Sequence, residues 1–137
     1  MKYLLDTNAC IGLINLRPAQ VQAHVDRALE SGAELFVSAI VAFELWYGVA
    51  RSVRPEQNAR RVETFFAGPV NLLPFGEEDA RSVGGIRAAL QSVGQSIGAY
   101  DLLIAGQAVR QNLTLITANV REFGRIKGLV WEDWTKP

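Results

Sequence analysis

Short apolar runs alternate with longer amphipathic segments along the whole chain, and this alternation restricts the fold more than any other feature. The short runs predict strands at 2–5, 35–38, 70–73, 113–117 and 129–131. Segments with the apolar spacing of helices predict helices at 8–16, 20–29, 39–50, 55–66, 77–93 and 98–111. Strands that alternate with helices form parallel sheets. The sequence therefore predicts an α/β fold built on a parallel sheet.

The length and composition favour one ordinary globular unit. The chain has 137 residues, of which 49% are hydrophobic and 20% charged, unlike disordered sequences. Its single cysteine, Cys10, cannot form an internal disulfide and is interpreted as a small buried apolar residue. The chain opens with no secretory leader, and no apolar run approaches the ~18 residues of a membrane span. We expect a single domain over residues 1–137 and a cytoplasmic protein.

Net charge gives no argument for nucleic acid, because 14 basic residues balance 14 acidic ones. The basic residues are nevertheless clustered, at Arg51, Arg54, Arg60 and Arg61 and again at Arg110, Arg121, Arg125 and Lys127. Either cluster could contact a nucleic-acid backbone. The alternative, which charge alone favours, is a solvated helix face with ion pairs to Glu56, Glu63 and Glu122.

Three acidic residues are each the only charge in a long uncharged stretch. They are Asp6 within 3–16, Glu44 within 35–50 and Asp101 within 88–109. Each lies beside apolar residues that should face the core, and none has a lysine or arginine nearby in the sequence. A partly buried carboxylate without a partner costs several kcal/mol. The burial cost of all three carboxylates must therefore be compensated.

A distant arginine, a raised pKa or a shared cation could each provide the compensation, although the acids could also be unrelated structural residues. A shared cation explains the most. Oxygen ligands without a histidine or cysteine cluster indicate Mg²⁺ or Mn²⁺ rather than zinc. Such an ion stabilises the charge that grows on a phosphate under attack, so the pattern indicates phosphodiester hydrolysis.

Polar and aromatic residues near these acids have both functional and structural interpretations. Thr7, Asn8, Thr117 and Asn119 could complete a polar rim, although Asn8 is also an acceptable N-cap and the last two could be turn residues. Trp46 and Tyr47 could stack on RNA bases, but core or dimer packing is the favoured interpretation. Tyr100 could line the groove beside Asp101. His24 is interpreted as a surface histidine.

Three segments carry a further signal, namely YLLDTNACIGLI near the start, SAIVAFELWYGVARS in the middle and IGAYDLLIAGQAVRQNLTLITANVREFGRIKGLVWEDW near the end. Together they resemble the PIN-domain family, and more narrowly the VapC toxins of bacterial toxin–antitoxin pairs. The resemblance is firm at both ends of the chain and loose from about 54 to 95. Asp6, Glu44 and Asp101 match the acids that form the metal site of the family.

The resemblance implies a three-layer α/β/α sandwich with a mostly parallel sheet, and an endoribonuclease dependent on Mg²⁺ or Mn²⁺. It implies a toxin of a type II system that inhibits translation and growth by cutting transfer or ribosomal RNA. Attack by a metal-bound water would leave 5′-phosphate and 3′-hydroxyl ends. A homodimer is usual in the family. A VapB-type antitoxin holds family toxins inactive, with its C-terminal segment over the active site and often a basic side chain in it.

The resemblance also assigns supporting roles. Asn119 stands where the family often has a fourth acid, which favours one firmly held metal over two, and it would assist catalysis through a water or the substrate phosphate. Val41 replaces a common Thr or Ser. The residues that we expect to contact RNA are Arg51, Arg54, Tyr100 and Arg121.

Two alternatives have different chemistry. A haloacid-dehalogenase-like phosphatase would need a second aspartate where the chain has Asn8, and a later lysine, whereas its lysines lie only near the ends, at Lys2, Lys127 and Lys136. A non-catalytic PIN-like module that binds RNA or protein would keep the fold without the chemistry. The intact set of three acids argues against this second alternative.

Overall fold

A five-stranded parallel sheet forms the centre of the molecule, which a computed structural model describes over residues 1–137. The strands are β1 (Lys2–Leu5), β2 (Glu34–Ser38), β3 (Asn71–Leu73), β4 (Thr114–Ile116) and β5 (Trp131–Glu132). Their order is β3-β2-β1-β4-β5, and each neighbouring pair is parallel. All carboxyl ends therefore meet at one edge of the sheet, where ligands gather in open α/β folds.

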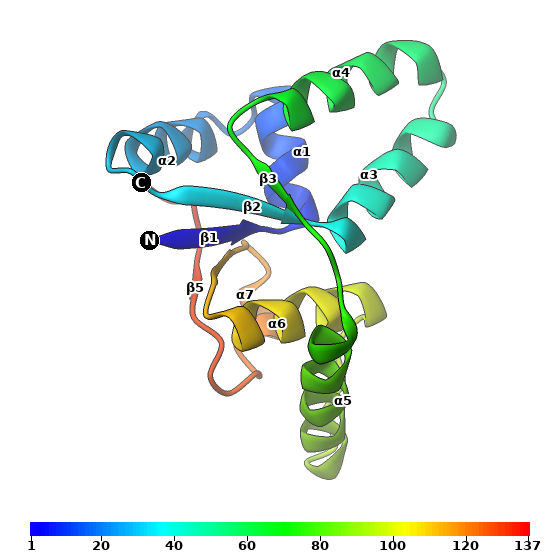
Figure 1. The fold of residues 1–137 in the computed structure, drawn as a ribbon, viewed down its shortest axis with the longest axis vertical. Helices are drawn as coiled ribbons and strands as arrows, with labels where there is room; N and C mark the ends of the chain where they lie inside the picture. The colour runs from blue at the N-terminus through cyan, green and yellow to red at the C-terminus, as the bar shows by residue number, and fades with distance from the viewer.

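Helices cover both faces of this sheet, which confirms the predicted α/β/α sandwich. They are α1 (Thr7–Asn15), α2 (Ala19–Glu30), α3 (Ala39–Ala50), α4 (Pro55–Ala67), α5 (Glu77–Ser92), α6 (Ala99–Gln111) and α7 (Val120–Phe123). In Figure 1, α1, α2 and α4 lie above β1 and β2, and α5 and α6 lie below them. No helix has the length and apolar character needed to cross a membrane.

The central strands are apolar because both of their faces are covered. Leu4 and Leu5 of β1 and Leu115 of β4 are completely buried. They belong to one core cluster of 22 buried residues that also includes Cys10, as expected. The polar side chains that the sequence singled out come directly after these strands, so the core determines where the site lies.

The structure corrects three local predictions. Asp6, not Asn8, is the N-cap of α1, and its side chain accepts a hydrogen bond from the backbone N–H of Ala9. The last strand is Trp131–Glu132 rather than 129–131, because these two residues pair with β4. The short helix α7 was not predicted, since four residues are too few to show a helical apolar pattern.

Helices α5 and α6 pack unusually closely at Gly106. A Cβ atom at this position would lie 2.3 Å from Cγ2 of Val83. The backbone carbonyl of Gly106 also accepts a hydrogen bond of 2.8 Å from the hydroxyl of Ser82 on α5. Glycine is therefore required here for close approach and not for backbone flexibility.

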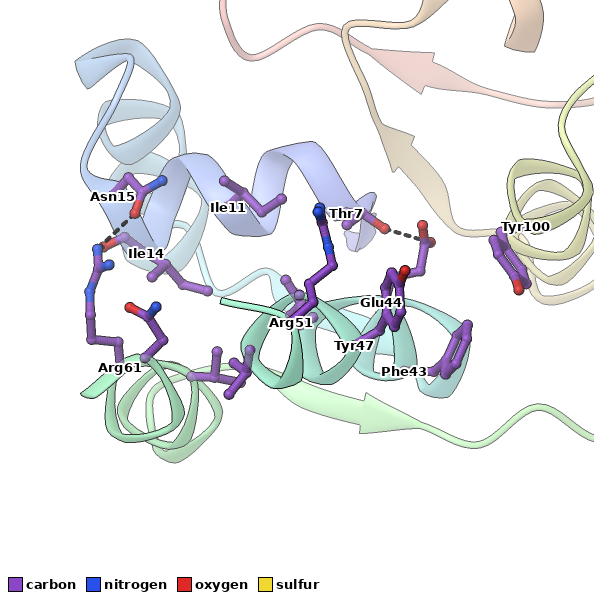
Figure 2. Close-up of a pocket in the computed structure, with 15 residues that line it drawn as sticks. Thr7, Ile11, Ile14, Asn15, Phe43, Glu44, Tyr47, Arg51, Arg61 and Tyr100 are labelled. Atoms are coloured by element: carbon purple, nitrogen blue, oxygen red, sulfur yellow. Dashed lines mark hydrogen bonds between the residues drawn. The ribbon is translucent and has the colours of Figure 1, made fainter. Parts of the chain in front are cut away.

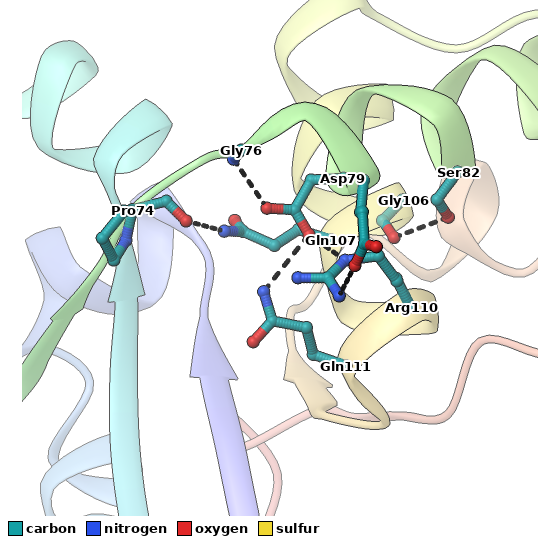
Figure 3. Close-up of polar contacts among 9 residues, drawn as sticks. Pro74, Gly76, Asp79, Ser82, Gly106, Gln107, Arg110 and Gln111 are labelled. Atoms are coloured by element: carbon teal, nitrogen blue, oxygen red, sulfur yellow. Dashed lines mark hydrogen bonds and ion pairs between the residues drawn. The ribbon is translucent and has the colours of Figure 1, made fainter.

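A buried ion pair joins the same two helices (Figure 3). Asp79 on α5 is 1% exposed and accepts hydrogen bonds from Arg110 at 2.6 Å, from Gln111 at 3.2 Å and from the backbone N–H of Gly76 at 2.9 Å. Burial alone would raise the pKa of Asp79, but these donors outweigh burial and hold the pKa below its ordinary value. The contacts hold α6, which carries Asp101, against α5.

Candidate active site

Asp6 lies at the junction of β1 and α1 and is only 5% exposed. Its carboxylate accepts the N–H of Ala9 at 2.7 Å and a hydrogen bond from the Thr117 side chain. Its own N–H donates to the carbonyl of Ile116 at 3.1 Å, which ties the end of β1 to the end of β4. Burial raises the pKa of Asp6, aided by the charges of Glu44 and Asp133, although the two hydrogen bonds act in the opposite direction.

Glu44 reaches the same edge from the middle of α3. The hydroxyl of Thr7 donates to Oε1 of Glu44 at 2.8 Å. Because Thr7 directly follows Asp6, this bond connects the start of α1 to α3. Figure 2 shows the carboxylate of Glu44 turned toward Thr7. The two acids therefore converge although 38 positions separate them in the sequence.

Asp101 lies in the first turn of α6 and completes the predicted set of three. Burial raises its pKa to about 6, together with a hydrogen bond shared with Glu122 and the charges of Glu122, Glu44 and Asp6. These causes place four carboxylates close enough to repel one another. We call Asp6, Glu44, Asp101 and Glu122 the acid cluster.

No basic side chain neutralises this cluster. The ion pairs of the molecule join Arg81 to Glu77, and Arg110 to Glu78 and Asp79. The predicted ion pairs to Glu56, Glu63 and Glu122 are therefore absent, and the ion-pairing interpretation holds only for Arg110, with different partners. The isolation of the acids in the sequence persists in three dimensions.

Glu122 is the site residue that the sequence analysis missed. It lies on α7, where Nδ2 of Asn119 donates to Oε2 of Glu122 at 3.3 Å. The sequence analysis treated Glu122 as a surface charge because Arg121 and Arg125 are close to it in the chain. A helical turn predicted after Asn119 would have indicated Glu122, because residues three positions apart lie on the same face of a helix.

Thr117 and Asn119 also lie in this region. The hydroxyl oxygen of Thr117 accepts the N–H of Asn119 at 3.0 Å, and the Thr117 side chain bonds to Asp6. Thr117 is buried and Asn119 is half-buried. Thr117 thus positions Asp6, and Asn119 positions Glu122. Asn8 is exposed and lines a small pocket together with Asp6, Thr117 and Asp133.

The acid cluster has the chemistry of a site for a hard divalent ion, because every donor is an oxygen and the site carries no positive charge. Burial is the largest cause of the raised pKa of Asp101, and the negative charges of Glu122, Glu44 and Asp6 add to it; a cation would relieve this repulsion. No three His, Cys, Asp or Glu side chains are arranged here to hold an ion, however. The acids bond to neighbouring hydroxyl and N–H groups and to one another, so they would have to turn to share an ion.

A groove of about 700 Å³ leads away from Glu44 between α1, α3 and α4. Thr7, Phe43 and Tyr100 line it near Glu44, and Arg51 and Arg61 line it farther along (Figure 2). Nη2 of Arg61 donates to Oδ1 of Asn15 at 2.7 Å at that far end. The groove thus runs from an acidic end to a basic end.

Of the four residues that we expected to contact RNA, two line the groove and two do not. Arg51 and Tyr100 line it, whereas Arg54 and Arg121 are exposed outside it. Trp46 and Tyr47 are 39% and 60% exposed, so they do not pack in the core, and packing in a dimer interface stays a prediction. Of these two residues, only Tyr47 lines the groove.

His24, interpreted as a surface residue, is half-buried and stacks on Trp134 with the two ring planes 9° apart.

Comparison with known proteins places this geometry in a family. The model of the PIN domain matches residues 3–129. Ribonuclease VapC2 of Rickettsia felis is 37% identical over 136 residues, which cover 99% of this chain and 100% of that protein. The tRNA(fMet)-specific endonuclease VapC of Shigella flexneri is 37% identical over 135 residues, covering 98% of this chain and 99% of the relative.

Solved structures agree with this assignment. The chain matches a structure of VapBC2 from Rickettsia felis bound to a promoter DNA fragment, with a TM-score of 0.91, 35% identity and coverage of 98% of this chain and 99% of that chain. It matches VapBC-1 from nontypeable Haemophilus influenzae with a TM-score of 0.89, 39% identity and coverage of 99% and 100%. The chain therefore belongs to the PIN-domain family, and within it to the VapC ribonucleases.

Proposed function

We propose that this chain is a Mg²⁺-dependent or Mn²⁺-dependent endoribonuclease and the toxin of a type II toxin–antitoxin pair. The observation that carries the metal dependence is the acid cluster, in which four carboxylates meet without a basic partner. Asp6, Glu44 and Asp101 would hold the ion, and Glu122 would contribute the fourth carboxylate. The bound ion would activate water and stabilise the charge on the phosphate under attack.

The side chains around the cluster have distinct roles in this proposal. Thr7 bonds Glu44, and Thr117 bonds Asp6, so these hydroxyl groups would keep both carboxylates close to the site while they turn toward a bound ion. Asn119 bonds Glu122 and would bond a water or the phosphate when that contact opens. Hydrolysis by water would leave a 5′-phosphate and a 3′-hydroxyl. A 2′,3′-cyclic phosphate on the product would exclude this mechanism.

We propose transfer RNA as the substrate class, with initiator tRNA as the first candidate. The support is that relatives from Shigella flexneri and Salmonella typhimurium, each 37% identical over 98% of this chain, are named tRNA(fMet)-specific endonucleases. Ribosomal RNA remains the second candidate. Cutting initiator tRNA would block translation and growth in the cytoplasm.

We propose a VapB-type antitoxin as the protein partner, because the solved relatives are VapBC complexes. The groove beside Glu44 suits an antitoxin segment, since about half of its lining residues are hydrophobic and Glu44 of the acid cluster lies at one end. A basic side chain at that end would pair with the carboxylates and exclude a metal ion. We also expect the chain to form a homodimer, alone and in the complex.

The test begins with brief expression of the chain, followed by mapping of cleavage ends in total RNA. We expect new 5′-phosphate ends at one transfer RNA loop, and no new ends with Asp101→Asn. The purified proteins are then titrated with Mg²⁺ or Mn²⁺ while thermal unfolding is followed, a measurement that needs no RNA. The wild-type Tm should rise with metal, and Asp101→Asn should respond weakly. Equal metal responses, or unchanged cleavage by the variant, would refute the proposal.

A further inference from the structure

Two half-exposed aromatic side chains stand beside the acid cluster, and each directly precedes one of its carboxylates. Phe43 precedes Glu44 on α3, and Tyr100 precedes Asp101 on α6. Their rings meet edge to face across the two helices, with centroids 5.4 Å apart and planes at 65°. Phe43 is 49% exposed and Tyr100 is 47% exposed. We call these two residues the aromatic pair.

Packing in the core does not explain why both of these side chains are aromatic. Neither ring belongs to the buried core cluster or to the partly buried residues packed against it. Leaving such large apolar surfaces in water forgoes the stabilisation that burial would give. Both rings line the groove at the end where Glu44 lies (Figure 2). Their position therefore indicates a ligand that passes beside the acid cluster.

We propose that the aromatic pair stacks on a nucleobase adjacent to the scissile phosphate of the RNA. This inference rests on the proposed ribonuclease function. If the scissile phosphate lies at the acid cluster, its two nucleotides must pass the residues next to Glu44 and Asp101. A single ribose joins base and phosphate, so one base comes within reach of the rings. Proteins commonly hold unstacked bases of single-stranded RNA on aromatic side chains.

The next residues along the groove favour RNA over a protein as the occupant of the aromatic pair. The guanidinium carbon of Arg51 lies 5.5 Å from the centroid of the Tyr47 ring, and both residues line the groove. In Figure 2, Glu44 lies between the aromatic pair on one side and Arg51 on the other, so an RNA strand with its scissile phosphate at the acid cluster would place a base on the aromatic pair and a backbone phosphate on the other side, near Arg51. A second copy of the chain would be the competing occupant, whereas the antitoxin segment would cover these rings only in the inhibited complex.

The test combines a change in the protein with a change in the substrate. The probe is a short single-stranded RNA that spans the mapped cleavage site, used intact or with an abasic residue on either side of the scissile bond. Wild-type kcat/KM should fall by about tenfold or more on one abasic substrate, because stacking on that base is lost. The double variant Phe43→Leu/Tyr100→Leu should lose a similar factor on intact RNA and little more on abasic RNA.

Two matched variants separate stacking from general damage. Tyr100→Phe keeps the ring, so its kcat/KM should still fall on the abasic substrate as it does for wild type. Trp46→Leu removes another exposed aromatic side chain from α3 that lies outside the groove, and it should behave as wild type. Circular dichroism would verify that all variants are folded.

A second readout does not depend on turnover. With 2-aminopurine at the same position, binding to the Asp101→Asn protein should quench the fluorescence of the base by stacking. Adding Phe43→Leu and Tyr100→Leu should abolish the quenching, whereas adding Trp46→Leu should not.

If kcat/KM falls by the same factor from intact to abasic RNA in wild type and in the double variant, the stacking inference is overturned, while the ribonuclease function stays intact. Normal cleavage by the double variant, with altered sedimentation or antitoxin binding, would also overturn it and assign the pair to a protein interface. Absence of cleavage by wild type on every RNA would instead count against the proposed function.

Discussion

The carboxyl group of Asp101 on α6 lies beside that of Glu122 on α7, close enough for the two groups to interact directly. Two adjacent carboxyl groups disfavour the doubly ionised state, so a proton or a cation stabilises the contact. The contact contributes to the raised pKa of Asp101, to about 6, after burial as the largest cause. The pair is thus the part of the acid cluster where a cation and a proton compete most directly.

Replacing Glu122 by Gln should lower cleavage by about tenfold or more without unfolding the protein, as loss of a supporting metal-site contact typically does. The amide keeps the shape of the side chain but cannot supply negative charge. Cleavage of the mapped RNA under single-turnover conditions measures the effect. Glu56→Gln, an exposed glutamate on α4 without an ion pair, is the control. Equal rates for the two variants would remove Glu122 from the site.

The stability of the metal-free protein should depend on Asp101 between about pH 4 and 6. Folding raises the pKa of Asp101 from its ordinary value of 3.8 to about 6, so the folded state holds a proton in this range that the unfolded chain releases. Stability from this group therefore falls as the pH rises through the interval. Asp101→Asn should flatten this part of a plot of Tm against pH, measured with a chelator present. Asp26→Asn, exposed on α2, should leave the slope unchanged.

Replacing Arg110 by Met should destabilise the fold by about 1–3 kcal/mol, because the Asp79 carboxylate stays buried and loses its charged donor. Arg81→Met breaks the exposed ion pair to Glu77 and should change stability by about 0.5 kcal/mol or less. Urea unfolding at pH 7 measures both. Similar small effects would show that the buried pair adds little to stability.

Replacing Gly106 by Ala should also destabilise the protein, by about 1–3 kcal/mol, because the new methyl group would overlap Val83. Gly84→Ala is the matched control on α5, where nothing lies within 4 Å of the added Cβ. It should stabilise the helix by about 0.5–1 kcal/mol. Chemical unfolding of the two variants tests this contrast. A neutral Gly106→Ala would mean that α5 and α6 can move apart freely.

The three acids could be predicted from the sequence because their surroundings are local. Each carries the only charge in a stretch whose apolar residues form the core, and the sheet brings the ends of β1, β2 and β4 to one edge. Glu122 could not be found in this way. Arginines surround it in the chain, and only the direction of α7 turns it toward Asp101 instead.

Trp46 and Tyr47 show a second limit of prediction from sequence. Helical spacing favoured core or dimer packing for Trp46 and Tyr47, but α3 turns its other face to the core, through Val41 and Leu45. A helix that is apolar on nearly all sides does not itself indicate which side is buried. The choice depends on neighbouring helices that the sequence of α3 does not describe.

Alternation of strands and helices and the isolation of three carboxylates are properties of neighbouring residues, so the sequence by itself determined the α/β fold and most of the acid cluster. Tertiary structure decided the rest, namely the addition of Glu122, the edge-to-face contact of Phe43 with Tyr100, and the groove that leads to Arg51 and Arg61. The physical reason is that each of these features joins side chains from different helices. Their proximity follows from how the helices pack on the sheet, which no local pattern encodes.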